Sequence, residues 1–299
     1  MTAKRMRGVI AAIATAIADD GTPDKARSLK LARFLLDNGC DGLNVLGTTG
    51  EATSFSLAER QGLMTAYREQ GLPMDRLMVG TGAAAVSDAV ALTKHAASLG
   101  FAGALLLPPF YYKGLQAPDD GLVAYVGAIV EATADTPIPI YLYHFPALSG
   151  LPWHVKLIGQ LIEKFGSRIA GLKDSSGDMP FAREAAKISG FDVFPSTEGC
   201  LLEARSGVFA GCISATANCN ADLCGRAWNN GDQAAHEQAV AIRQLFDGKA
   251  LVAGIKALLA HVHGDPALAQ VKPPMAAFGA ADRSAVIAGH DALRAKKVA

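Results

Sequence analysis

Residues 42–69 read GLNVLGTTGEATSFSLAERQGLMTAYRE, and this stretch contains the unit from which the fold can be deduced. It begins with a short apolar run, residues 42–46, that has the length and composition of a buried strand. Glycines and threonines follow at residues 47–50, and an amphipathic segment with helical spacing, residues 57–69, begins directly after a serine. A strand, a glycine-rich turn and a helix in this order are typical of the β-α units that build parallel sheets.

The same alternation recurs along most of the chain. Short apolar runs predict eight strands, at residues 8–16, 42–46, 77–80, 103–107, 138–144, 169–173, 192–195 and 211–214. Amphipathic segments between them predict helices, among them residues 25–38, 57–69, 87–99, 120–134, 153–165 and 179–189. Eight parallel strands with intervening helices favour an α/β fold of the (β/α)8 type, a TIM barrel, and an open doubly wound sheet is the alternative.

The strand pattern stops after about residue 220. Residues 231–247, 252–263 and 282–295 have helical periodicity, and Lys272-Pro273-Pro274 interrupts the chain between the last two. We therefore expect a catalytic barrel over residues 1–224 and a C-terminal helical extension, residues 225–299, packed on it.

Composition limits the possible partners. The 299 residues are 50% hydrophobic and contain 28 basic and 28 acidic side chains, so no charged field that would attract nucleic acid or anionic lipid is expected. No apolar run reaches the roughly 18 residues of a membrane span. We expect a cytoplasmic protein with a small-molecule substrate and with neither nucleic-acid nor membrane partners.

The sequence gives no sign of a disulfide framework or a metal site. Its five cysteines are odd in number and form no C-x-x-C pair, which predicts reduced packing residues. His261 and His263 form an H-x-H pair, but no carboxylate cluster accompanies them at metal-ligand spacing.

Polar residues lie where four of the predicted strands end. In (β/α)8 barrels the chemistry gathers at the C-terminal ends of the strands, so these residues are expected to form one site. They are Gly47-Thr48-Thr49-Gly50-Glu51 after the second strand, Pro109-Phe110-Tyr111-Tyr112 after the fourth, Tyr143-His144 in the fifth and Lys173 in the sixth.

Lys173 ends an apolar run and is the candidate nucleophile. Burial disfavours the charged ammonium form, and a neutral amine can form a Schiff base with a ketone. The alternative is a lysine that extends from the strand edge to the surface.

The turn at residues 47–50 can bind a carboxylate. Gly47 and Gly50 permit a tight turn whose N–H groups, together with the hydroxyls of Thr48 and Thr49, form a small anion pocket. The alternative is a strand-to-helix turn with capping residues. Tyr143 is the candidate proton carrier, with Thr48 and Tyr111 as hydroxyl partners in a relay, and the alternative is a packed tyrosine whose hydroxyl is satisfied.

Four ordered segments carry a family resemblance. They are GTTGE at 47–51, PFYY at 109–112, YHFPALSG at 143–150 and GLKDSSGD at 171–178. Together they resemble the dihydrodipicolinate synthase and N-acetylneuraminate lyase superfamily of pyruvate-dependent class I aldolases, over roughly the first 220 residues. The resemblance implies a homotetrameric barrel in which a lysine forms an imine with pyruvate, or with the pyruvate portion of a 2-oxo acid, without a cofactor.

The resemblance also implies roles for individual residues. Lys173 matches the Schiff-base lysine, Tyr143 the proton-shuttling tyrosine, and Thr48 and Thr49 the threonines of the carboxylate and relay site. Tyr111 matches a tyrosine that crosses the tight dimer interface into the neighbouring active site. A further set is expected to line the substrate site: Gly47 and Ser175 from the matched motifs, and Ile213, which matches the eighth-strand residue whose carbonyl lies near the lysine.

Two departures bear on the substrate. Dihydrodipicolinate synthases share an arginine that binds the carboxylate of aspartate semialdehyde, and the matching residue here is Leu148. The segment Pro146-Ala147-Leu148-Ser149-Gly150 instead looks like the lyase version. Sialic-acid lyases follow the seventh strand with Gly-x-Asp-Glu, and this chain has Ser196-Thr197-Glu198-Gly199, so Glu198 is expected to contact a shorter polyol. A third departure, Ala14-Thr15-Ala16-Ile17 in place of a Thr-Pro-Phe-like turn, has no explanation in the sequence alone.

The expected function is an aldolase or lyase that acts on a 2-oxo-3-deoxy sugar acid or a similar 4-hydroxy-2-oxo acid. The alternatives are a dihydrodipicolinate synthase (4-hydroxy-tetrahydrodipicolinate synthase) that condenses pyruvate with aspartate semialdehyde, an N-acetylneuraminate lyase, and a dehydratase or deaminase that uses the same imine. An alternative of another class is a non-catalytic barrel that binds 2-oxo acids.

Overall fold

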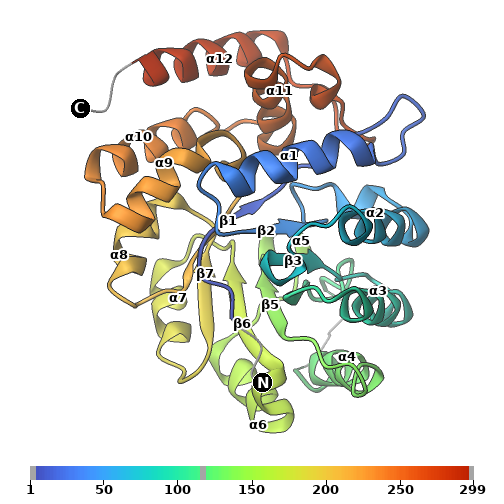
Figure 1. Cartoon of the computed structure of the whole chain (residues 1–299). Helices are drawn as coiled ribbons and strands as arrows, with labels where there is room; N and C mark the ends of the chain where they lie inside the picture. The colour runs from blue at the N-terminus through green and yellow to red at the C-terminus, as the bar shows by residue number, and fades with distance from the viewer. Residues whose placement is uncertain (1–4, 115–118, 296–299) are drawn as a thin grey trace.

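The computed structural model describes residues 5–114 and 119–295, and its centre is one sheet of eight parallel strands (Figure 1). The strands are β1 (Gly8–Ala12), β2 (Gly42–Val45), β3 (Leu77–Gly80), β4 (Gly103–Leu106), β5 (Ile140–His144), β6 (Ile169–Asp174), β7 (Asp192–Pro195) and β8 (Gly211–Ser214). Their order is β7-β6-β5-β4-β3-β2-β1-β8. The Ala210 N–H donates to the Val193 carbonyl at 3.0 Å where the two edges approach, so the barrel is nearly closed. The predicted (β/α)8 barrel is confirmed, and the open doubly wound sheet is excluded.

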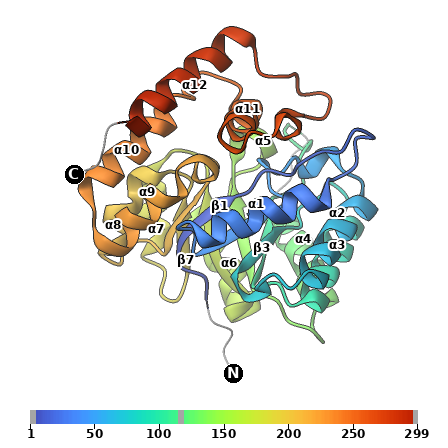
Figure 2. The same ribbon diagram turned by 45° about the horizontal axis from the view of Figure 1, so that its top comes forward.

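Helices surround the strands on the outside, as Figure 1 shows. They are α1 (Lys25–Asp37), α2 (Leu57–Glu69), α3 (Val86–Leu99), α4 (Asp119–Ala132), α6 (Val155–Phe165), α7 (Met179–Ala186), α8 (Leu201–Arg205) and α9 (Ala217–Asn230), with the short α5 (Pro146–Ser149) directly after β5. The C-terminal region consists of α10 (Gln233–Gln244), α11 (Leu251–His263) and α12 (Ala280–Ala295). α10 and α11 contact α9, and Figure 2 shows this region gathered on one side of the barrel.

The start of α2 shows why a helix begins so soon after the glycine-rich turn. Ser56 Oγ accepts a hydrogen bond from the Glu59 N–H at 3.3 Å, and Glu59 Oε2 accepts one from the Ser56 N–H at 2.7 Å. This capping box satisfies two N–H groups that have no partner within the helix. The buried face of α2, which includes Leu63, Met64 and Tyr67, packs into the core, so cap and core together fix where the turn ends.

The interior of the barrel is a packed core. Its buried apolar side chains are Met6, Ile10, Ala12, Met78, Leu105, Tyr141, Tyr143, Ala170, Phe194, Ala210 and Ile213. A Cβ added at Gly103 or at Gly171 would lie 2.8 Å from the Tyr141 ring, so the strands on both sides need glycine beside it. Because the interior is filled, a site has room at the ends of the strands.

Two of the differences from the sequence prediction are at β1 and at α9. β1 ends at Ala12, since the N–H groups of Ala14 and Ala16 donate to side chains, Asn218 Oδ1 and Ser28 Oγ, each at 3.1 Å, and not to a neighbouring strand. Helix α9 was not predicted, because buried polar residues such as Asn218 and Asn220 interrupt its apolar pattern. The expected division between residues 224 and 225 falls inside α9, and the ends of the two expected units, residues 1–4 and 296–299, lie outside the described residues.

Within residues 5–114 and 119–295, no helix has both the length and the apolar character that crossing a membrane requires. The five cysteines are free and buried. The same part of the chain holds no cluster of three or more His, Cys, Asp or Glu side chains that could bind a metal ion. His261 pairs with Asp291 at 3.0 Å, and His263 packs edge-on against Phe34.

Candidate active site

Lys173 lies inside the barrel. Its exposed fraction is 3%, and its Nζ is 4.2 Å from the centroid of the Tyr143 ring. The two residues are register partners on β6 and β5, so the pairing of the strands sets them side by side. A lysine extended to the surface is therefore excluded.

Tyr143 joins Lys173 to the glycine-rich turn. Its hydroxyl and Thr48 Oγ1 are 3.2 Å apart, and either can donate. Burial raises the pKa of Tyr143, but the positive charge of Lys173 and hydrogen bonds from Thr48, Ser175 and Lys173 outweigh it and lower the pKa below its ordinary value. The phenol therefore loses its proton more readily than burial alone would allow.

We expect that Lys173→Met raises the pKa of Tyr143. The substitution removes the positive charge of Lys173, which lowers the Tyr143 pKa more than any other group does. The burial of the phenol, which raises the pKa, remains. An ultraviolet titration of phenolate formation measures the change, with Lys173→Met/Tyr143→Phe to assign the signal. Lys164→Met, at a lysine whose Nζ lies over the Phe165 ring, is the control. An unchanged or lowered Tyr143 pKa in Lys173→Met would contradict the described geometry.

The turn at residues 47–50 is held by its own backbone and by Thr15, which follows β1. The Glu51 N–H donates to the Thr48 carbonyl at 3.0 Å, the Ala52 N–H donates to the Gly47 carbonyl at 3.2 Å, and Thr15 Oγ1 donates to the Gly50 carbonyl at 2.8 Å. Gly47 is needed for space, because a Cβ there would lie 2.7 Å from Asn44 Oδ1. The Thr15 bond gives a physical reason for threonine in the unusual opening segment.

A cavity of about 280 Å³ opens beside Tyr143 and Thr48. Gly47, Leu148 and Phe110 also line it. Lys173 does not line this cavity, but its Nζ lies against the ring of Tyr143, which does. A second cavity, of about 470 Å³, shares Thr48 and Leu148 with the first and extends between α5 and the starts of α11 and α12.

The structure brings most of the expected site residues together. Lys173, Tyr143 and Ile213 occupy the barrel interior, while Thr48, Gly47 and Leu148 line the cavity. Thr49 is buried within the turn, and Ser175 follows β6 near the phenol.

Tyr111 is placed apart from them. Its exposed fraction is 88%, and it has a φ of 78°, which is uncommon for a residue other than glycine. The structure of one chain does not bring it to the Tyr143 hydroxyl of that chain.

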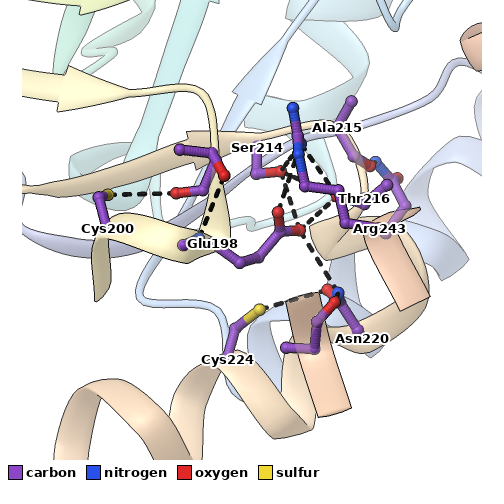
Figure 3. Close-up of polar contacts among 12 residues, drawn as sticks. Glu198, Cys200, Ser214, Ala215, Thr216, Asn220, Cys224 and Arg243 are labelled. Carbon is purple, nitrogen blue, oxygen red and sulfur yellow. Dashed lines mark hydrogen bonds and ion pairs between the residues drawn. The ribbon is translucent and has the colours of Figure 1, made fainter. Parts of the chain in front are cut away.

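Glu198 is not at this site, which corrects the expectation that it contacts a substrate polyol. Its side chain is fully buried in the short 3-10 helix Glu198–Cys200 (Figure 3). Oε1 accepts hydrogen bonds from Thr216 Oγ1 and from Ser214 Oγ at 2.9 Å, and Oε2 pairs with Arg243 at 3.3 Å. Because the carboxylate is occupied by protein donors, Glu198 joins β8, α9 and α10, and we assign it a structural role.

Glu198→Gln is expected to lower the free energy of unfolding by about 1.5–3 kcal/mol, the range for hydrogen bonds to a charged group. Urea unfolding measures the loss, and the KM for the substrate is expected to stay unchanged. Glu203→Gln is the matched control, since the Glu203–Arg183 pair at 2.7 Å lies at the surface, where solvent screens it, and its loss should change stability much less. A raised KM in Glu198→Gln with undiminished stability would return Glu198 to the substrate site.

Sequence reasoning missed the residues that support the backbone at and next to Tyr143 and Lys173. Trp153 Nε1 donates to the Tyr143 carbonyl at 3.1 Å, and the Trp153 N–H donates to His144 Nδ1 at 3.1 Å. Asp174 Oδ1 accepts from the N–H and the hydroxyl of Ser176 at 2.9 and 2.7 Å, while burial raises the pKa of Asp174 and lowers that of His144. Asp174 is signalled by its place next to Lys173, whereas the Trp153 contacts form only on folding.

Comparison with known proteins agrees with this geometry. Residues 5–290 match the model of the Dihydrodipicolinate synthetase family. An uncharacterised DapA-like lyase from Chloroflexus aurantiacus is 35% identical over 215 residues, which cover 70% of this chain and 69% of the relative. A 4-hydroxy-tetrahydrodipicolinate synthase from Methanococcoides burtonii is 33% identical over 251 residues, which cover 80% and 82%.

Among solved structures, the dihydrodipicolinate synthase from Agrobacterium tumefaciens has a TM-score of 0.89 and 28% identity, and the match covers 96% of this chain and 99% of that one. The barrel, the buried lysine and tyrosine at its strand ends, and the family match over nearly the whole chain agree. This chain belongs to the dihydrodipicolinate synthetase family and is an enzyme of the class I aldolase and lyase type.

Proposed function

We propose that this enzyme cleaves or forms a carbon–carbon bond through an imine between Lys173 and the pyruvate portion of a 4-hydroxy-2-oxo acid. The observation that carries the proposal is the buried Lys173 amine beside a phenol, Tyr143, whose hydroxyl is hydrogen-bonded to Thr48. An amine and a proton carrier in contact are the two groups that imine-based cleavage needs.

The proposed cleavage begins with formation of the imine. The Lys173 nitrogen attacks the C2 ketone, the Tyr143 phenol gives up its proton and water leaves, which yields a protonated imine and a Tyr143 phenolate. The C4 hydroxyl proton passes to Tyr143 as the C3–C4 bond breaks, the electron pair moves to the imine nitrogen to give an enamine, and the aldehyde departs. Protonation of the enamine at C3 and addition of water then release pyruvate and the free amine.

The substrate carboxylate is proposed to bind at the turn at residues 47–50, through the Thr48 and Thr49 hydroxyls and backbone N–H groups beside Gly47. Ser175 and the Ile213 carbonyl complete the surroundings of the reacting carbons in this proposal. It has support from the short contact between Thr48 and Tyr143, which brings the turn beside the phenol. A carboxylate bound there would have its ketone within reach of the amine beside that phenol.

We propose further that the enzyme is a homotetramer in which Tyr111 of one subunit enters the site of another. The support is the 88% exposure of a tyrosine that the backbone holds at a φ of 78° next to the cavity-lining Phe110. In one chain this phenol has little contact with protein, and a subunit interface would supply it.

The part of the substrate beyond C4 is proposed to pass Leu148 towards the second cavity. Leu148 offers no donor for a second carboxylate, and a charge-assisted hydrogen bond of that kind contributes about 1.5–3 kcal/mol. This favours a 2-oxo-3-deoxy sugar acid or another 4-hydroxy-2-oxo acid with an uncharged tail. The second candidate, 4-hydroxy-tetrahydrodipicolinate synthase, has support in the names of relatives such as the Methanococcoides burtonii protein.

A substrate panel tests the proposal. Release of pyruvate is followed from 2-oxo-3-deoxygluconate and its stereoisomers, 4-hydroxy-2-oxoglutarate and N-acetylneuraminate, and condensation of pyruvate with aspartate semialdehyde is measured in parallel. Faster turnover of an uncharged-tail substrate supports the proposal, and preference for aspartate semialdehyde supports the second candidate. Pyruvate binding without turnover of any of these would support the non-catalytic barrel.

A further inference from the structure

A buried ion pair lies directly behind the turn at residues 47–50. Lys256, on α11 of the C-terminal region, donates from Nζ to Glu51 Oε1, and the side chains are 1% and 0% exposed. The same Nζ donates to the Thr15 carbonyl at 3.0 Å, and Glu51 Oε2 accepts from the Lys272 N–H at 2.8 Å. Residues 15, 51, 256 and 272 therefore meet around this ion pair.

Glu51 is the residue through which this contact reaches the turn. It follows Gly50 directly and has a φ of 54°, in the left-handed region that is unfavourable for residues other than glycine. The surrounding bonds hold it there, because its N–H donates to the Thr48 carbonyl and Thr15 Oγ1 donates to the Gly50 carbonyl. A shift of the Glu51 side chain would therefore move the backbone that carries Thr48.

Fold stability alone does not call for charges at this place. Removing two charges from water is costly, and a well-packed apolar pair of similar volume often stabilises a protein as well or better. Unlike an apolar pair, a charged and hydrogen-bonded pair fixes the orientation of its groups. Here the Lys256 Nζ donates to two acceptors, on the segments of Thr15 and Glu51. The arrangement thus suits the precise placement of a loop.

We infer that Glu51 and Lys256 are positioning residues, which hold the turn at residues 47–50 so that Thr48 meets Tyr143 and the turn accepts the carboxylate of pyruvate. The inference rests on the proposed function. By this contact the C-terminal helical region acts on the pyruvate site through α11, and Thr15 belongs to the same group of contacts.

The test uses the full-length protein and follows the trapping of pyruvate by borohydride at increasing pyruvate concentration. Lys256→Met is expected to raise the half-saturating pyruvate concentration by about 10- to 100-fold, the loss that a displaced positioning group causes. The trapping rate at saturating pyruvate is expected to fall less than about threefold, since Lys173 and Tyr143 are untouched.

Two further variants separate positioning from stability. Glu51→Gln/Lys256→Met leaves no unpaired buried charge, so its melting temperature is expected to exceed that of Lys256→Met, while its half-saturating pyruvate concentration stays raised. Arg243→Met is the matched control, because it also breaks a pair between a C-terminal helix and a buried carboxylate, that of Glu198. It is expected to lose stability and keep the wild-type pyruvate dependence.

A double variant with wild-type pyruvate dependence, or an Arg243→Met variant as impaired as Lys256→Met, would overturn the positioning role and leave the proposed function standing. A wild-type protein that traps no pyruvate would overturn the proposed function and this inference with it.

Discussion

Lys173→Ala is expected to abolish turnover, with pyruvate release falling by at least about 10⁴-fold, because the whole catalysed path runs through the imine. Among the described residues, the other buried lysine is Lys256, and its amine already donates to Glu51 and to the Thr15 carbonyl, so it is not free to take over. Steady-state assays of pyruvate release, with the best substrate of the panel, measure the loss.

Two controls make this result specific. Lys173→Arg keeps a positive charge beside Tyr143 but presents no nucleophilic amine, so it is expected to be as inactive as Lys173→Ala. Lys187→Ala alters a surface lysine that pairs with Glu184 and is expected to keep full activity. Turnover above about a hundredth of wild type in Lys173→Ala would show that the chemistry does not pass through this nitrogen.

The second large effect is expected at Tyr143. Tyr143→Phe should lower the turnover number by about 10²- to 10⁴-fold, the contribution of a positioned proton carrier. Imine formation should be less affected, because the ring that packs beside Lys173 remains and Thr48 is unchanged. Single-turnover kinetics separate the two steps when imine trapping and aldehyde release are measured on the same sample.

Thr48→Val supplies the comparison for Tyr143. It removes the hydroxyl that bonds to the phenol but keeps the size of the side chain, so its effect on turnover should be smaller than that of Tyr143→Phe. Equal losses in imine trapping and in turnover for Tyr143→Phe would assign this tyrosine to packing.

Much of the barrel could be predicted because its strands are short, apolar and buried on both faces. β3, β7 and β8 have the bounds that the sequence indicated, since each lies between clear turn residues. Lys173 and Tyr143 could be paired in advance because parallel strands bring their C-terminal ends to the same edge of the barrel.

The remaining features depend on contacts between distant segments. Glu198 resembles a substrate ligand in sequence, but its environment is set by Ser214, Thr216 and Arg243, which the fold brings to it. The Glu51–Lys256 pair joins residues 205 positions apart, so no local sequence pattern could predict it. Helix α9 escaped prediction for a related reason, since its buried asparagines are satisfied by tertiary partners such as the Ala12 and Ala239 carbonyls.

The central claim is that the Lys173 nitrogen bonds covalently to the keto carbon of pyruvate. The most direct measurement is to incubate the protein with pyruvate and borohydride, digest it, and locate the reduced adduct by mass spectrometry of the peptides. We predict one adduct, on the peptide that carries Lys173, whose yield saturates with pyruvate. An adduct on another lysine, or none at saturating pyruvate, would contradict the account.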